Sequence, residues 1–145
     1  MPICAALWQD CGDNGVAKIP EGSKREEKLI VTEDIAINFL GSDGARVLST
    51  PNMILGLERT SRNLVLPLLE PGYDTLGTHV NVYHLAATPV GMTVRFHSAV
   101  TSVDDRRVNF KVEAFDEKEK IAEGTHQRFI VNVARFTERV REKAR

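Results

Sequence analysis

The sequence predicts an α+β fold in which a sheet of about five antiparallel strands wraps around one long helix. Three observations support this prediction. A segment that begins near residue 50 has the apolar spacing of an amphipathic helix, one short strand pattern precedes it, and several segments with alternating apolar and polar residues follow it. The chain has 145 residues, the size of one ordinary domain, so we expect a single domain that spans residues 25–145.

The N-terminal part of the chain is expected to contain a leader, a strand and a loop. Residues 1–24 mix Gly, Pro, Asp and Asn without a sustained apolar period, which predicts a loosely ordered leader. Leu29, Val31 and Ile35 among charged neighbours predict a first strand between residues 25 and 35. The two glycines of the following segment, NFLGSDGARVL, indicate a flexible loop or a broken helix.

The long helix is predicted for the segment STPNMILGLERTSRNLVLPLLEPG. Thr50 followed by Pro51 predicts that Thr50 is the N-cap and that Pro51 is the first helical residue, where a missing N–H costs nothing. Pro67 is expected to kink the helix or to end its regular hydrogen bonding. One sector of the helical wheel is apolar, and its residues are Met53, Ile54, Leu57, Leu64, Val65 and Leu68. The helix is therefore expected to bury one face.

The second half of the chain is predicted to form strands. Alternation marks strands around residues 80–84, 92–96 and 108–112, and the segment IAEGTHQRFIVNV predicts a last strand. DDRR at 104–107 is expected to be a tight connection between two of them. The basic segment ARFTERVREKAR at the C-terminus predicts an amphipathic helix or tail.

Composition excludes several classes of partner. The formal charge is −1, with 27% charged and 42% hydrophobic residues, so nothing predicts a nucleic-acid-binding surface. Both cysteines, Cys4 and Cys11, lie in the leader, where they cannot assemble a disulfide framework or a four-ligand zinc site. No stretch approaches the ~18 apolar residues of a membrane span. We therefore expect a cytoplasmic protein that binds neither nucleic acid nor membrane.

Three polar residues interrupt the apolar pattern. Thr50 lies at the start of the helix, Glu58 borders the apolar sector two turns later, and His84 ends the inward row of a strand. Glu58 falls beside Ile54 and Val65 on the wheel, so its carboxylate is expected to be partly desolvated. A carboxylate, an imidazole and a hydroxyl at a helix N-terminus suit acyl-group hydrolysis. They supply a base or nucleophile, a proton carrier and a positive helix end that favours an oxyanion.

Each of these residues also has a structural interpretation. Thr50 could only cap the helix, and Glu58 could reach water or pair with Arg62 as a surface ion pair. His84 could be a satisfied core or interface histidine. The sequence places no comparable polar residues with the remaining histidines, which are His79, His97 and His126. No histidine spacing predicts a metal site, and the residues alone leave the catalytic and structural interpretations open.

Two longer stretches carry a resemblance to a known family. They are STPNMILGLERTSRNLVLPLLEPGYDTLGTHVNVYHLAATPVGMTV and EGTHQRFIVNVARFTERVREK, which contain the motifs LLEPG, LGT, HxAATPxG and GTHxR. From about Lys28 to the C-terminus the chain resembles hotdog-fold thioesterases, and within them the fluoroacetyl-CoA thioesterase family. The motifs occur at the family's spacing without gaps, which makes the resemblance more specific than any one short motif.

The resemblance implies a hotdog fold in which two subunits pair into one continuous sheet, with the acyl-CoA sites near the interface. It implies a catalytic set of Thr50 as orienting hydroxyl, Glu58 as general base or acyl-accepting carboxylate, and His84 as proton carrier. It also implies contacts from Gly77, whose backbone N–H can approach a thioester, and from Arg128, which can meet the carbonyl or the anionic CoA arm. No metal or other cofactor is implied, and coenzyme A enters as part of the substrate.

The segment before Thr50 departs from the family pattern. The fluoroacetyl-specific enzyme carries phenylalanines there that form a hydrophobic lid, whereas this chain has Gly41 and Gly44 at the matching places. The motifs therefore predict an acyl-CoA thioesterase for a short or medium acyl group but do not identify that group. The alternative is a non-catalytic acyl-CoA-binding or sensing module on the same fold. A hotdog hydratase is a weaker alternative, because its Asp and His motif is not found.

Overall fold

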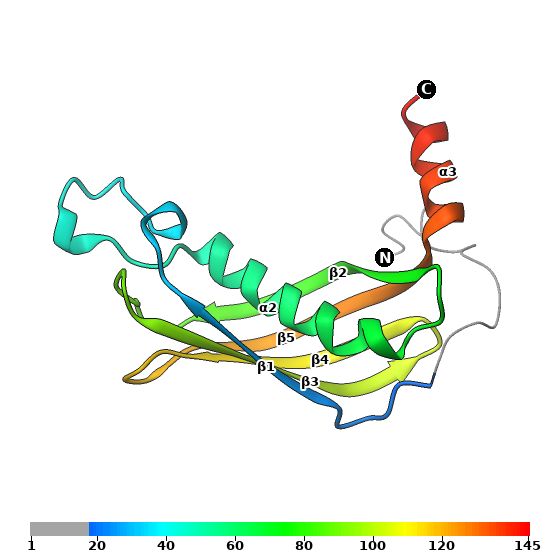
Figure 1. The fold of residues 1–145 in the computed structure, drawn as a ribbon, viewed down its shortest axis with the longest axis horizontal. Helices are drawn as coiled ribbons and strands as arrows, with labels where there is room; N and C mark the ends of the chain where they lie inside the picture. Colours follow the sequence, from blue (N-terminus) through cyan, green and yellow to red (C-terminus); the bar gives the residue numbers. More distant parts are fainter. Residues whose placement is uncertain (1–17) are drawn as a thin grey trace.

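A long helix lies along one face of a five-stranded antiparallel sheet in the computed structural model, which describes residues 18–145 (Figure 1). The strands lie in the order β1–β3–β4–β5–β2. They are β1 (Lys24–Ile30), β2 (Tyr73–His84), β3 (Thr93–Asp104), β4 (Arg107–Phe115) and β5 (Lys120–Asn132). The long helix is α2 (Thr50–Val65), a shorter helix α3 (Val133–Lys143) follows β5, and the short 3-10 helices are η1 (Glu33–Ile35), η2 (Asp43–Ala45) and η3 (Leu66–Leu68). The predicted α+β class and order of elements are confirmed.

The first strand is shorter than predicted. β1 ends at Ile30, and Val31 exchanges backbone hydrogen bonds with the turn before β3 before the chain enters η1. Most of the predicted leader lies outside the described residues. Of its described end, Ile19 is buried and residues 22–23 hydrogen-bond to the backbone of Val100 in β3. The sheet therefore extends its contacts slightly N-terminal to β1.

The prediction of Thr50 as N-cap is wrong, because Ser49 caps α2. The Ser49 backbone is extended, with φ −71° and ψ 147°, and its Oγ accepts a hydrogen bond from the Asn52 N–H at 3.3 Å. Thr50 is the first residue of the helix and Pro51 the second. Pro51 is tolerated there as well, because the first four N–H groups of a helix have no partner within it. The Thr50 hydroxyl is consequently free to bond elsewhere.

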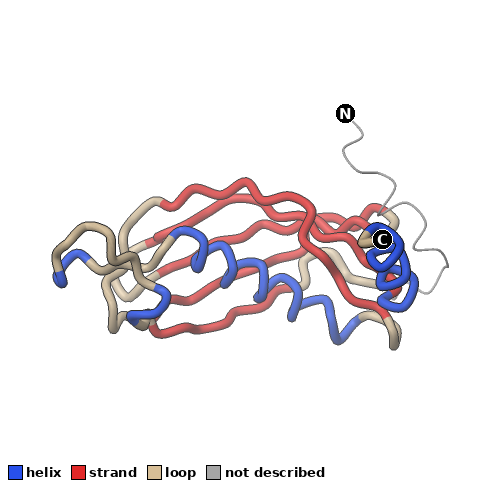
Figure 2. The backbone as a smooth tube through the Cα atoms, turned by 90° about the horizontal axis from the view of Figure 1, so that it is seen from above, coloured by secondary structure: helices blue, strands red, loops and turns tan. Residues whose placement is uncertain are grey.

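Helix α2 packs very closely on the sheet. A Cβ added to Gly56 would lie 2.3 Å from the Phe96 ring, so only glycine fits where the helix crosses that ring. Ser61 and Ser98, both buried, join helix and strand through their hydroxyls at 2.7 Å. As predicted, Pro67 lies just beyond the regular helix, which ends at Val65 and continues into η3. Figure 2 shows α2 running along the sheet.

Strand β2 forms an edge of the sheet and contains a β-bulge. Gly77 pairs with Arg128 and His79 pairs with Gln127 of β5, which leaves Thr78 as an extra residue. Because side chains alternate between the faces of a strand, one extra residue reverses the alternation beyond it. Positions 75 and 77 before the bulge and 80, 82 and 84 after it therefore all face α2. The predicted inward row 80–84 is thus correct, although Val80 at the sheet edge is 38% exposed.

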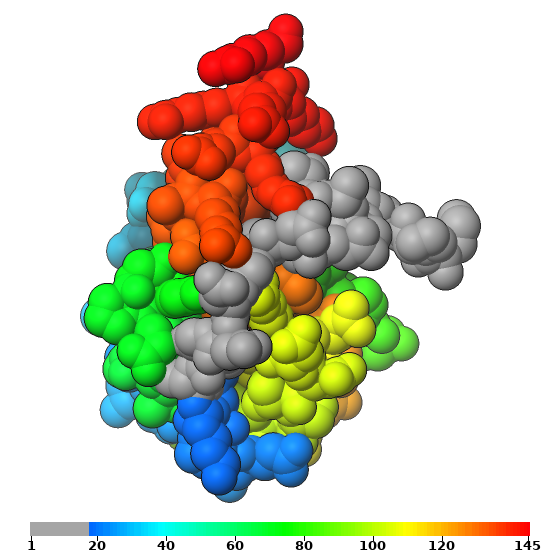
Figure 3. Space-filling view, turned by 90° about the vertical axis from the view of Figure 1, so that its right-hand side faces the viewer, coloured from blue at the N-terminus to red at the C-terminus, as the bar shows by residue number. Residues whose placement is uncertain are grey.

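The two ends of the sheet carry different appendages. The loop with η1 and η2 extends beyond the start of α2, and α3 lies at the opposite end (Figure 1), where it stands away from the body (Figure 3). No residue of α3 is fully buried, and the predicted C-terminal amphipathic helix is confirmed. Within residues 18–145, no helix is long and apolar enough to cross a membrane.

Candidate active site

Thr50 and His84, which lie far apart in the sequence, meet at the N-terminus of α2. The Thr50 Oγ1 and the His84 Nδ1 form a hydrogen bond of 2.8 Å. Thr50 is in the first turn of the helix and His84 is the last residue of β2. We call these two residues the N-terminal cluster. The start of a 16-residue helix carries a partial positive charge, so this cluster lies where negative charge is favoured.

His84 is half-buried and incompletely bonded. Its Nε2 is inaccessible to solvent, yet it makes no hydrogen bond with any residue in 18–145. Burial lowers the pKa of His84 below its usual range, while a hydrogen bond with the Ala86 backbone acts in the opposite direction. The imidazole is therefore neutral near pH 7 and able to accept a proton. A buried polar atom without a partner is uncommon in folded proteins and points to a missing neighbour.

An apolar pocket of about 380 Å³ opens beside this pair. Thr50 and His84 are its polar residues, and the apolar ones are Ile37, Phe39, Val47, Leu48, Leu85, Ala86 and Ala87. Phe39 is 77% exposed and lies in the loop between η1 and η2. Gly41 and Gly44 leave open space where a side chain would stand. Phe39, two positions before the first of these glycines, is an aromatic lining residue that the comparison of glycines with the family pattern did not predict.

Glu58 lies in a second cluster further along α2. Eight residues of helix separate it from Thr50, a rise of about 12 Å. Its side chain is 34% exposed, as the predicted partial desolvation requires, and its Oε1 lies 3.8 Å from the Arg128 Nη1. The alternative pairing with Arg62 is wrong, because Arg62 forms a two-bond ion pair with Asp74. Within one chain, Glu58 therefore does not join Thr50 and His84.

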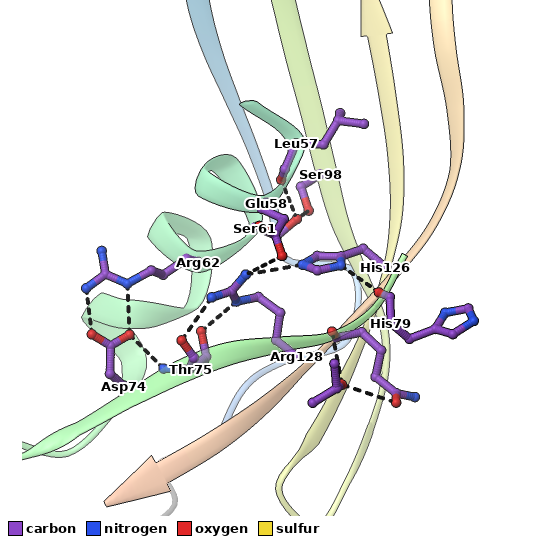
Figure 4. Close-up of polar contacts among 12 residues, drawn as sticks. Leu57, Glu58, Ser61, Arg62, Asp74, Thr75, His79, Ser98, His126 and Arg128 are labelled. Atoms are coloured by element: carbon purple, nitrogen blue, oxygen red, sulfur yellow. Dashed lines mark hydrogen bonds and ion pairs between the residues drawn. The ribbon is translucent and has the colours of Figure 1, made fainter. Parts of the chain in front are cut away.

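Arg128 is held on several sides (Figure 4). It is 5% exposed; its Nε donates to the Thr75 Oγ1 at 2.8 Å and its Nη2 donates to the Thr75 carbonyl at 2.9 Å. Its Nη1 lies 3.2 Å from the His126 Nε2. We call Glu58, Thr75, His126 and Arg128 the arginine cluster. The contact of Arg128 with substrate stays a prediction, and most of its donors are bonded within the chain.

Gly77 belongs beside the arginine cluster. A Cβ added there would lie 2.2 Å from the Glu58 Oε1 and 3.3 Å from the His126 Cε1. The Glu58 carboxylate therefore occupies space that any larger residue at 77 would fill. This requirement is independent of the backbone contact with a thioester that the resemblance implies. It gives a structural reason for the glycine of the LGT motif.

His126 is the residue that sequence reasoning missed. The sequence offers no comparable polar residues beside it, unlike Thr50, Glu58 and His84. The available signal was its position two residues before Arg128, which places both side chains on the same face of β5. No group of three or more His, Cys, Asp or Glu side chains in residues 18–145 is arranged to hold a metal ion.

Comparisons with known proteins agree with this architecture. Residues 31–134 match the family described as fluoroacetyl-CoA-specific thioesterase. A fluoroacetyl-CoA thioesterase of Streptantibioticus cattleyicolor is 38% identical over 97 residues, which cover 67% of this chain and 70% of that protein.

Solved structures give the same picture. The structure of the fluoroacetyl-CoA thioesterase FlK superposes with a TM-score of 0.80 at 30% identity, covering 87% of this chain and 98% of that one. A thioesterase superfamily member of Thermus thermophilus gives a TM-score of 0.79 at 29% identity, covering 88% and 94%. The predicted hotdog fold is confirmed by these structures.

Proposed function

The chain belongs to the fluoroacetyl-CoA-specific thioesterase family, and we propose that it hydrolyses a short or medium acyl-CoA to a carboxylate and free coenzyme A. The hydrogen bond between Thr50 and His84 carries this proposal. It presents a neutral imidazole and a hydroxyl at a helix N-terminus, beside an apolar pocket that suits an acyl chain. Coenzyme A is part of the substrate, and the reaction as proposed uses no other cofactor. The cytoplasmic location remains a prediction.

His84 and Thr50 act on the thioester in this proposal. As the C–O bond forms and the C–S bond breaks, one proton leaves the attacking water and one reaches the departing thiolate sulfur. The neutral His84 carries this proton from the water's side to the sulfur, and the carboxylic acid product then ionises. Thr50 orients the imidazole through Nδ1, and the first N–H groups of α2 favour the negative charge that develops on the carbonyl oxygen.

Glu58 completes the site from a second subunit. The middle of β2 is exposed at the sheet edge, with Val80 38% and Tyr83 67% exposed. An edge strand has unpaired backbone groups that can pair with the same strand of a second copy. In an antiparallel pair centred between Val80 and Asn81, Gly77 faces His84 of the partner subunit. The proposed homodimer therefore brings Glu58, which lies against Gly77, toward that histidine.

The β-bulge supports this arrangement. Residues 77 and 84 differ by an odd number of positions, so in a regular strand their side chains would point to opposite faces. Because Thr78 is an extra residue, both positions face α2. The Nε2 of His84, which has no partner among the described residues 18–145, then has a carboxylate as its expected neighbour. Glu58 would act there as the general base that takes the proton of the water and passes it to His84, or as the carboxylate that accepts the acyl group.

The decisive experiment measures thiol release from acyl-CoAs with acyl groups from acetyl and fluoroacetyl to decanoyl. We expect turnover by the wild type and its loss in both Glu58→Ala and His84→Ala. Binding of the acyl-CoAs without thiol release would instead favour a non-catalytic binding module. Loss of 2-enoyl-CoA absorbance without thiol release would favour a hydratase.

Mixing the two inactive variants tests the shared site. If subunits exchange, half of the dimers contain one chain of each kind, and each such dimer has one intact site. The mixture should regain about a quarter of the wild-type activity. A mixture that stays inactive although mass spectrometry shows exchanged dimers would contradict a site shared between subunits.

A further inference from the structure

The ring of His126 lies between a carbonyl group and a guanidinium. Its Nδ1 is 2.8 Å from the His79 carbonyl oxygen and its Nε2 is 3.2 Å from the Arg128 Nη1. A carbonyl only accepts hydrogen bonds and an arginine only donates them. Nδ1 therefore carries the proton, and the lone pair of Nε2 accepts from Arg128. The bulge in β2 lies beside the His79 carbonyl that fixes this orientation.

The surroundings keep the ring neutral and fixed. His126 is buried and stacks on Phe110, with ring centroids 5.9 Å apart. Burial lowers the pKa of His126 and the charge of Arg128 lowers it further, while the His79 carbonyl and the Glu58 carboxylate act in the opposite direction. The His79 side chain points away from the cluster (Figure 4). If Nε2 carried a proton, that proton would point at the Arg128 guanidinium, and Nη1 would lose its hydrogen-bond acceptor.

Thr75 accepts from the Nε and Nη2 of the planar guanidinium, and His126 supplies the acceptor that holds its third nitrogen, Nη1. That nitrogen is the one that faces the Glu58 Oε1 at 3.8 Å. Moving Nη1 would leave the carboxylate, which is packed against Gly77, without its cationic neighbour. The three side chains thus form a chain of contacts from the buried ring to the proposed reacting group.

We propose that His126 is a positioning residue that holds the Arg128 guanidinium against the Glu58 carboxylate. The inference rests on the proposed thioesterase function, in which Glu58 reacts. In this role His126 acts on Glu58 only through Arg128. Its role requires one property, an acceptor at the place of Nε2, and that property separates it from a histidine that merely fills the core.

Two substitutions isolate the acceptor. In His126→Gln the side-chain oxygen can reach the place of Nε2, whereas in His126→Asn the shorter side chain can replace only the Nδ1 donor. We expect His126→Asn to lose about 10- to 100-fold in kcat with a smaller change in KM, because a displaced reacting group affects the chemical step. His126→Gln should keep most of the wild-type kcat. Equal losses in both variants at equal thermal stability would overturn the proposal.

A double-mutant cycle tests whether His126 acts through Arg128. In an Arg128→Gln background, His126→Asn should cause little further loss, because the group that it positions is gone. A full additional loss in that background would contradict the proposal. If the wild type itself releases no thiol from any acyl-CoA, the proposed function fails, and kinetics no longer tests the inference.

The histidine ring can be tested without activity. In protein with ¹⁵N-labelled histidines, His126 should show the neutral form protonated at Nδ1, and its Nε2 resonance should shift in Arg128→Leu, which removes the donor to that nitrogen. Finding the form protonated at Nε2, or an unchanged Nε2 resonance in Arg128→Leu, would overturn the proposal independently of turnover.

Discussion

The two polar clusters between α2 and β2 differ in how completely their hydrogen bonds are satisfied. In the arginine cluster, each nitrogen of the buried guanidinium faces an acceptor. In the N-terminal cluster, Thr50 and His84 share one bond and the buried Nε2 of His84 has no partner in residues 18–145. The guanidinium is saturated within one chain, whereas the imidazole of the N-terminal cluster keeps one nitrogen for a further partner.

The largest expected effect comes from a substitution at Gly77 that disturbs the arginine cluster. In Gly77→Ala the added methyl overlaps the Glu58 carboxylate at 2.2 Å, so the carboxylate must move. We expect turnover to fall about 100-fold. Gly44→Ala is the matched control, because its Cβ meets nothing within 4 Å. Wild-type turnover by Gly77→Ala would show that the carboxylate position is not needed.

The N-terminal cluster is broken by removing one hydroxyl. Thr50→Val keeps the shape of the side chain but loses the bond to His84, and we expect kcat to fall about 10- to 100-fold, with Thr50→Ser restoring much of it. Ser49→Ala removes the true helix cap and should cost about 1 kcal/mol of stability without changing kcat. If Thr50→Val lowers only stability, its hydroxyl has a purely structural role.

Acid should weaken the fold through the histidines of both clusters. Burial lowers the pKa of His84 and of His126 in the folded protein. In the unfolded chain a histidine has a pKa of about 6.5. Between the unfolded and folded pKa values, the unfolded chain binds more protons, so the free energy of unfolding falls as pH falls through that window.

Urea denaturation at pH 7.5 and 5.5 measures this effect. The carboxyl groups whose pKa is lowered by folding lose their contribution to stability only below their unfolded pKa values of about 4. They therefore do not affect stability between pH 7.5 and 5.5. His126→Gln should show a smaller decrease than the wild type. An equal decrease in the two proteins would mean that His126 is not kept neutral by the fold.

The smallest expected effect concerns the pocket of the N-terminal cluster. Phe39→Ala opens one wall of that pocket and should shift the preferred acyl length, with kcat/KM changing by no more than about tenfold for the best substrate. Leu40→Ala is a suitable control, because Leu40 is exposed but does not line the pocket. The ratio of rates on acetyl-CoA and octanoyl-CoA measures the shift. Equal ratios in wild type and Phe39→Ala would remove Phe39 from substrate selection.

Periodicity predicted most of the fold because each element buries a regular set of apolar residues. The alternation in β3 and β4 and the apolar sector of α2 are local properties of the sequence. The N-cap was missed because proline is tolerated at the first and second helical positions alike, so Pro51 could not distinguish Ser49 from Thr50.

The site was less predictable because its contacts are not local. The four-residue spacing made Arg62 one possible partner of Glu58, but each of these helix residues finds its partner on a strand, Arg128 and Asp74 respectively. The family motifs identified Thr50, Glu58 and His84 together, yet one chain brings only the first and last into contact. Nothing in the spacing of residues reports whether two such groups belong to one subunit or to two.

The extra residue in β2 also restricts how the length of this strand can change. Deleting Thr78 would restore regular alternation, so the row that ends at His84 would turn to the outer face and Tyr83 would be directed toward Thr50. Inserting one residue between Gly77 and His84 would have the same result. An insertion or deletion of two residues would leave the remaining side chains of the strand on their present faces of the sheet. Changes in the length of this segment that retain the site are therefore expected to occur in even numbers.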